Sequence, residues 1–100
     1  MQKPLDRLKK LNTKDSLWIY ILSLLKSKEL YGCEIPSLIE QQYKFKPGRI
    51  TPYRVLYRLE QQKLVVSKFI NRKRMYKITD HGNEQLISAK IFYKNLLEKL

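Results

Sequence analysis

The sequence predicts a mainly helical protein with one small β-hairpin, an α+β fold. Over most of the chain, apolar residues recur at spacings of three and four, as they do along one face of an α-helix. Residues 64–78 differ, because β-branched residues flank a short polar turn there, which is typical of a hairpin. A length of 100 residues, with 43% hydrophobic and 30% charged residues, indicates one globular domain.

The N-terminal half predicts a short segment and two helices. Residues 1–13 carry leucines at every third position with basic residues between them, and form either an arm or a short helix. Thr13 or Asp15 can cap a helix over residues 16–28, whose apolar residues on nearly every side indicate the centre of a small core. After a glycine turn, the apolar spacing predicts a second helix that ends near Tyr43.

A third helix is predicted to start at Thr51 and Pro52. Threonine is a favourable N-cap, and proline fits the first helical position because its missing N–H has no partner there. The preceding segment, residues 44–50, contains a Pro-Gly pair and is expected to be a loop. The apolar stripe of the helix continues to residue 62 or 63.

A hairpin and a long last helix complete the chain. Strands over residues 64–70 and 75–78 flank four turn residues, 71–74, which give the hairpin a basic tip. Thr79 or Asp80 caps the last helix, whose apolar residues follow alternating steps of three and four, a heptad pattern. The order helix, helix, helix, hairpin, helix is that of a winged helix-turn-helix with an extended C-terminal helix.

Positive charge is concentrated in one part of the chain. Between Lys44 and Lys77 there are eleven basic residues and a single acid, Glu60, which gives this window +10 of the chain's net charge of +12. Six aromatic residues lie in or beside the window: Tyr43, Phe45, Tyr53, Tyr57, Phe69 and Tyr76. This combination is typical of a protein that binds a polyanion.

Nucleic acid is the favoured polyanion, with an anionic membrane and a simply solvated surface as alternatives. A membrane-surface helix would be long, basic and uninterrupted, whereas Pro47, Gly48 and Pro52 interrupt this window. Solvated surfaces usually mix charges of both signs. A basic helix followed by a basic hairpin favours double-stranded DNA.

The sequence predicts no enzyme. His81 is the only histidine and Cys33 the only cysteine, and no spacing of further ligands would complete a zinc site. The glycines form neither a P-loop nor a dinucleotide fingerprint. We therefore expect no catalytic residue, no metal and no cofactor. The lone cysteine, the short apolar runs and the lack of a secretory signal predict a cytoplasmic protein.

Three segments resemble the PadR-like family of transcriptional regulators. They are LWIYILSLLKSKELYGCEI, TPYRVLYRLEQQKLV and RMYKITDHG. In order, they resemble the family's passage from first to second helix, its third helix, and its second wing strand with the Thr-x-x-Gly that opens the last helix. The resemblance covers residues 16–83. It departs at Pro52 (usually leucine), Arg54 (usually proline) and Lys63 (usually glycine), and without the glycine we expect the third helix to end differently.

The resemblance implies a homodimeric, sequence-specific DNA-binding transcriptional regulator, most often a repressor, that reads a pseudo-palindromic operator. Its half-sites would lie about one helical turn (roughly 34–36 Å) apart. The chain would divide into an N-terminal arm or short helix (1–13), a winged helix-turn-helix DNA-binding domain (14–79) and a dimerisation helix (80–100). The expected dimer interface is Leu86, Ala89, Tyr93, Leu96, Leu97 and Leu100. Some relatives bind aromatic effectors, but no residue here points to such a pocket.

The expected DNA-binding residues lie on the third helix, in the loop before it and at the wing. They are Lys44, Lys46, Arg49, Thr51, Tyr53, Arg54, Tyr57, Arg58, Arg72, Lys73 and Arg74. Arg54 is the first choice for a base contact in the major groove, because a guanidinium can bind guanine bidentately, with a phosphate contact as the alternative. The wing residues are expected at the minor groove. For Tyr53 the alternative is a core position, and for Tyr57 it is packing against the wing.

Other placements and functions stay open at this point. Lys9 and Lys10 either meet phosphates or lie near the dimerisation helix, and Trp18 belongs to the core or the dimer interface. Two alternative functions are a non-specific nucleic-acid or chromatin-type binder and a winged-helix protein-interaction module.

Overall fold

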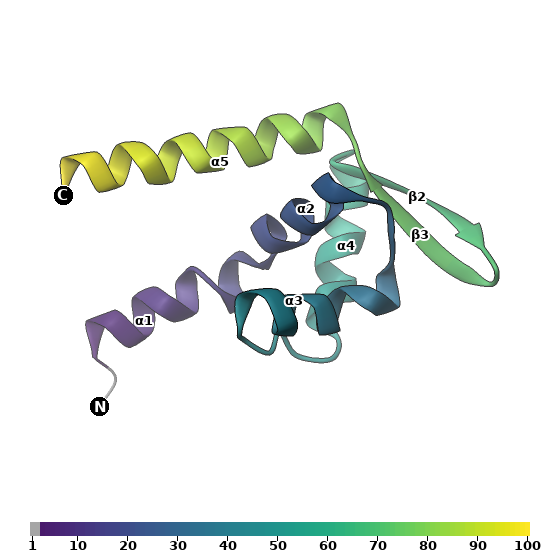
Figure 1. The fold of residues 1–100 in the computed structure, drawn as a ribbon, viewed down its shortest axis with the longest axis horizontal. Coiled ribbons are helices and arrows are strands. Elements are labelled where there is room, and N and C mark those ends of the chain that lie inside the picture. The colour runs from purple at the N-terminus through teal and green to yellow at the C-terminus, as the bar shows by residue number, and fades with distance from the viewer. Residues whose placement is uncertain (1–2) are drawn as a thin grey trace.

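The computed structural model describes residues 3–100, so Met1 and Gln2 of the expected N-terminal segment lie outside the described residues. Its elements are α1 (Pro4–Leu11), the 3-10 helix η1 (Lys14–Ser16), α2 (Leu17–Ser27), β1 (Leu30–Tyr31), the 3-10 helix η2 (Gly32–Glu34), α3 (Ile35–Tyr43), α4 (Thr51–Gln61), β2 (Val65–Ile70), β3 (Lys73–Ile78) and α5 (Asp80–Lys99). The β2–β3 hairpin projects from one side of the α2–α4 body, while α1 and α5 run out on the other (Figure 1). The predicted α+β class and winged-helix order are confirmed.

Helix α2 forms the centre of the core, as its apolar sequence predicts. Leu17, Ile21 and Leu22 on this helix are at most 2% exposed. They belong to one buried cluster with residues from the elements around them: Ile35, Ile39, Leu56, Leu59, Val65, Tyr76 and Leu86. Each fully buried aliphatic side chain contributes about 1.5–3 kcal/mol of transfer free energy. The core therefore fixes α4 and the hairpin on a common support.

The hairpin belongs to a three-stranded antiparallel sheet with the order β1-β3-β2. Strand β1 pairs Leu30 with Tyr76 and Tyr31 with Met75. The sequence predicts only the two hairpin strands, because a two-residue strand has no detectable periodicity and its partner lies far along the chain. This third strand attaches the base of the hairpin to the segment that follows α2.

The hairpin turn has two residues rather than the four expected. Ile70 pairs with Lys73, which leaves only Asn71 and Arg72 in the turn. Their φ angles of 53° and 63° are left-handed, as a type I′ hairpin turn requires at both central positions. Lys73 and Arg74 are therefore strand residues, and their side chains point to opposite faces of the sheet.

Two predicted helix starts are wrong in detail. Neither Thr13 nor Asp15 caps α2, because the 3-10 helix η1 intervenes and Ser16 occupies the N-cap position without a side-chain cap bond. Helix α4 begins at Thr51, so this threonine is the first helical residue instead of the cap, and Pro52 follows it inside the first turn.

The end of α4 also differs from expectation. Lys63 adopts the left-handed conformation, with φ at 63°. The N–H of Leu64 donates to the Leu59 carbonyl at 2.9 Å and that of Lys63 to the Glu60 carbonyl at 3.0 Å, which is the bond pair of a Schellman motif. The helix thus ends as it would with glycine, although a non-glycine residue pays about 1–2 kcal/mol for this conformation.

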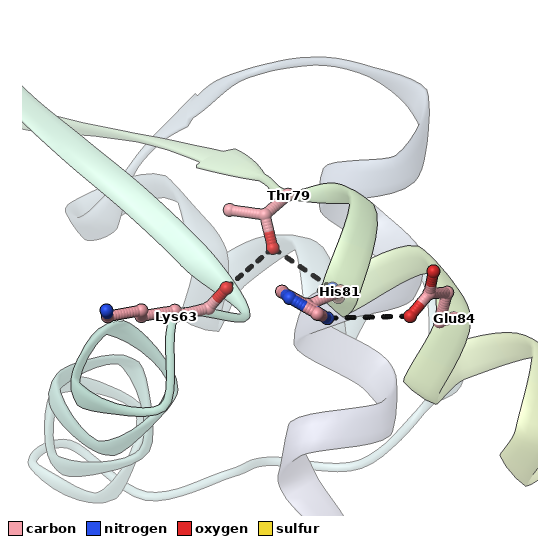
Figure 2. A network of polar contacts seen from close by, with 5 residues as sticks. Lys63, Thr79, His81 and Glu84 are labelled. Carbon is pink, nitrogen blue, oxygen red and sulfur yellow. Dashed lines mark hydrogen bonds and ion pairs between the residues drawn. The ribbon is translucent and has the colours of Figure 1, made fainter.

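Thr79 connects this helix end to the start of α5 (Figure 2). Its Oγ1 donates to the Lys63 carbonyl at 2.7 Å and accepts the Gly82 N–H at 3.0 Å. Of the two predicted caps, Thr79 is therefore the one in use. A Cβ on Gly82 would lie 2.2 Å from the Leu64 carbonyl oxygen, so only glycine lets α5 start this close to the end of α4.

Helix α5 extends well beyond the core, on the same side of the molecule as α1 (Figure 1). Of its 20 residues only Gly82 and Leu86 are buried. Large apolar side chains on both helices are exposed: Leu5, Leu8, Leu11, Ile87, Ile91, Phe92, Leu96, Leu97 and Leu100. Within residues 3–100, no helix is long and apolar enough to span a membrane.

Candidate nucleic-acid interface

The outer face of α4 presents the candidate base-reading residues. Pro52, Leu56 and Leu59 are buried on the inner face. With 3.6 residues per turn, this arrangement directs Arg54 and Tyr57 away from the core, and both are exposed. The face is continuous over the first two turns, the part of a recognition helix that usually contacts base edges.

Both tyrosines of α4 lie at this surface. Tyr53 is 46% exposed, so it is not a core residue, and Tyr57 is 64% exposed, so most of its side chain is open to solvent. The Tyr57 hydroxyl accepts a hydrogen bond from Gln61 Nε2 at 3.3 Å. Gln61 is absent from the sequence-based set, although its place four residues after Tyr57 on the outward stripe is a signal for it. A glutamine amide can bind adenine bidentately.

Half of the aromatic residues associated with the basic window serve the core instead. Tyr43 and Phe45 pack edge-on against Tyr20, with ring centroids 4.8 Å and 5.0 Å away. Tyr76 is 8% exposed. Burial raises the pKa of Tyr76, and the negative charge of Glu60 raises it further. Tyr53, Tyr57 and Phe69 are therefore the aromatic residues of the set that can meet DNA.

The loop before α4 borders a cleft rich in lysine. Lys46 and Thr51 line this cleft, of about 430 Å³, together with Lys10 and Lys14 from the N-terminal segment. Asp15 is the one acidic residue among its lining residues. Lys14 is a further candidate for phosphate contact that the sequence does not reveal, because its proximity to the loop arises only in the fold. Because Lys10 also lines this cleft, it lies on the side of α1 that faces the start of α4.

The remaining loop and helix candidates are exposed as well. Lys44 ends α3 in a left-handed conformation, and Arg49 lies in the loop beside Tyr53 at a second hollow. Arg58 borders a cavity of about 380 Å³ that it shares with Lys14 and Trp18. Trp18 itself packs against the core cluster.

The three predicted wing residues do not form one basic tip. Arg72 lies in the turn and is exposed. Lys73 Nζ stands 5.3 Å from the ring centroid of Tyr31 on one side of the sheet. Arg74 lies on the other side, with its guanidinium carbon 4.4 Å from the ring centroid of Phe69. Charge thus covers the turn and both faces of the hairpin.

The residues expected at a dimer interface fall into two groups. Leu86 is 2% exposed and belongs to the core, so its side chain offers no surface to a partner. Tyr93 is half-buried, and its hydroxyl donates to Asn12 Oδ1 at 2.8 Å, which ties α5 to the link after α1. Ala89 is half-buried as well and lines the same hollow as Tyr93. The other group consists of Leu96, Leu97 and Leu100, which are 44%, 72% and 90% exposed.

In the part of the chain that the structure describes, no cluster of three or more His, Cys, Asp or Glu residues could bind a metal. Cys33 is free and exposed.

Comparison with known proteins agrees with this arrangement. The family model described as Transcriptional regulator PadR-like family matches residues 21–88. A PadR family transcription regulator from hypervirulent Clostridium difficile R20291 is 28% identical, with a TM-score of 0.72 over 81% of this chain and 90% of that chain. No functionally curated protein shows significant similarity.

Two further solved structures share the fold at lower identity. A PadR-like transcription factor from Bacteroides fragilis is 23% identical, with a TM-score of 0.79 over 94% of this chain and 95% of that one. A transcriptional regulator from Clostridium thermocellum is 22% identical, with a TM-score of 0.71 over 100% and 98% of the two chains.

Proposed function

The chain belongs to the PadR-like family of transcriptional regulators, and from this membership we propose that it binds operator DNA sequence-specifically, as a homodimer, and represses transcription. The observation that carries the proposal is that cationic side chains flank the exposed face of α4 at both of its ends. The exposed face of α4 lies between a lysine-lined cleft and a hairpin with charge at its turn and on both faces. Regulators of this family are not enzymes, and the residues of this surface bind anions.

In the proposed complex, α4 enters the major groove with its first two turns. Arg54 is the base-reading residue, because its fork of N–H donors fits O6 and N7 of guanine. Tyr57 and Gln61 extend the reading surface along the same stripe. Arg72 reaches the minor groove from the hairpin turn, where arginine is attracted by the enhanced negative potential of narrow grooves.

Phosphate contacts would fix the register of α4 on the duplex. The cleft that contains Lys10, Lys14, Lys46 and Thr51 lies beside the N-terminal end of α4 and can receive a backbone phosphate. Arg49, Arg58 and Lys44 would meet neighbouring phosphates. Such contacts supply affinity on any sequence and leave discrimination to Arg54 and its neighbours.

The exposed apolar residues of α5 and α1 support a homodimer. Apolar surface of this extent, left uncovered on two helices that run out on the same side of the molecule (Figure 1), is typical of an association surface. We place Leu96, Leu97 and Leu100 in the interface, with Ala89 and Tyr93 at its inner edge, and leave Leu86 in the protomer core. The two-fold axis would make the operator pseudo-palindromic, with residues 14–79 as the DNA-binding unit, 80–100 as the dimerisation helix, and 1–13 as an accessory arm.

Selection of bound duplexes from a random-sequence library tests this function. A salt concentration of about 0.15–0.2 M is suitable, because it weakens non-specific phosphate binding. Recovery of a two-fold symmetric motif supports a dimeric, sequence-specific regulator. Binding without any recovered motif would indicate a sequence-indifferent DNA binder, and no binding even at low salt would indicate a protein-interaction module.

A further inference from the structure

Arg74 is held in a defined position on the wing. It lies directly opposite Phe69 across the β2–β3 pair, and its guanidinium stacks on that ring at 4.4 Å. Its Nη1 donates a hydrogen bond to Ser67 Oγ at 2.9 Å. Phe69 is 67% exposed, so the stacked pair is open to solvent, although it lies on the sheet face that carries the buried Val65 and Tyr76 nearer the base of the hairpin.

Ser67 carries this contact onward to the recognition helix. Its hydroxyl donates a hydrogen bond to Glu60 Oε2 at 2.7 Å and accepts one from Arg74. The single hydroxyl group therefore acts as donor and acceptor at the same time. Glu60 lies in the last turns of α4, and it is the only acid between residues 44 and 77. Hydrogen bonds in such a series, with a charge at each end, strengthen one another.

We propose that Glu60 and Ser67 are positioning residues that hold Arg74 of the wing in its DNA-contacting orientation, so that the recognition helix and the wing meet DNA as one unit. This inference rests on the DNA binding proposed above. A free arginine side chain loses much rotamer freedom when it binds a phosphate. A guanidinium that is already held by a ring and a hydroxyl loses less, and therefore binds more tightly.

The position of Glu60 supports this role. Glu60 is the only acid among residues 44–77, and a carboxylate close to a DNA-binding surface repels phosphates unless it serves a structural purpose there. Glu60 is half-buried, and it accepts a hydrogen bond from the Ser67 hydroxyl, which in turn accepts one from Arg74. The contrast is with Arg72, for which no side-chain hydrogen bond is found among residues 3–100. Arg72 is therefore the matched arginine without a positioning chain.

A double-mutant cycle on DNA binding tests the inference. Ser67→Ala removes the bridging hydroxyl and changes no charge. We expect it to weaken binding to duplex DNA about fivefold, the usual effect of one hydrogen bond, when Arg74 is present. In the Arg74→Ala background we expect no further loss, and in the Arg72→Ala background the same fivefold loss. Ser67→Thr, which keeps the hydroxyl and suits a strand, should restore wild-type affinity.

The controls separate positioning from stability. Ser88→Ala, at an exposed site on α5, should leave affinity unchanged. Thermal unfolding of each variant shows that the compared proteins are folded at the temperature of the binding measurement. An equal loss from Ser67→Ala with and without Arg74 would overturn the inference, because it would assign Ser67 a purely structural role. The inference would also be overturned if Ser67→Ala caused no loss of DNA affinity, whether Arg74 is present or replaced by alanine. Absence of DNA binding by the wild-type chain would instead contradict the proposed function.

Discussion

Thr79 Oγ1 donates a 2.7 Å hydrogen bond to the backbone carbonyl of Lys63, and this bond joins the end of α4 to the start of α5. The same oxygen accepts the Gly82 N–H, so one side chain caps α5 and satisfies a carbonyl just beyond α4 (Figure 2). In the proposed dimer, α5 sets the distance between the two recognition helices. The contact at Thr79 would then transmit the dimer geometry to the DNA-reading surface.

Replacement of Thr79 should therefore destabilise the fold. Thr79→Ala removes both an N-cap and a link between elements, and we expect a loss of about 1–2 kcal/mol in the free energy of unfolding. Chemical denaturation followed by circular dichroism measures this change. Thr79→Ser keeps the hydroxyl and should recover most of the stability. Equal stability of the alanine variant and the wild type would show that the observed bonds contribute nothing net.

Glycine at position 63 should stabilise the protein. Lys63 has a φ angle of 63°, which glycine adopts without steric cost, and we expect Lys63→Gly to gain about 0.5–1 kcal/mol. Lys28→Gly is the matched control, because Lys28 has an extended backbone with φ at −167°, and glycine there should be neutral or destabilising. A loss of stability at position 63 as large as at position 28 would contradict the conformational argument.

The sequence predicted the helices well because their apolar residues recur regularly over many positions. It failed at the helix start and the hairpin turn, where the residue types fit more than one local structure. Thr13 and Asp15 are good caps by residue type, yet η1 inserts a turn before α2 begins. Asn71–Arg74 has the composition of a four-residue turn, but left-handed Asn71 and Arg72 close the hairpin earlier and draw Arg74 into the strand.

The sequence predicted which charged residues belong to the candidate site, but not which of them lie close together or contact one another. Arg54 and Tyr57 follow from helical periodicity, since the inward stripe identifies the outward one. The proximity of Lys14 to Lys46 and the bonds from Glu60 through Ser67 to Arg74 depend on how distant segments pack. Leu86 has the heptad position of an interface residue, but α2 and the other core residues bury it within the protomer.

Arg54 should contribute to discrimination between DNA sequences. We expect Arg54→Ala to cost about 1–3 kcal/mol on the selected operator and to relax preference at one base position. Fluorescence anisotropy with the operator and a set of single-base variants measures both effects. Arg54→Lys, which keeps the charge without the bidentate fork, should still lose discrimination. An identical loss on operator and unrelated duplex would reassign Arg54 to a phosphate.

Lys14 should contribute affinity without discrimination. Because it lines the cleft with Lys46, we expect Lys14→Ala to weaken all duplexes similarly and to reduce the slope of log affinity against log salt by about 0.9, the value for one phosphate contact. Lys28→Ala removes an exposed lysine that lies outside this cleft and should leave the slope unchanged. Equal slopes for Lys14→Ala and wild type would exclude the cleft as a phosphate site.

The most direct test of the central claim is the affinity for the selected operator when about five base pairs are inserted between its half-sites. This insertion turns one half-site by half a helical turn, so a dimer with its recognition helices fixed by α5 cannot reach both. We predict that the affinity falls to that of a single half-site. Unchanged affinity would contradict a homodimer that reads a two-fold symmetric operator.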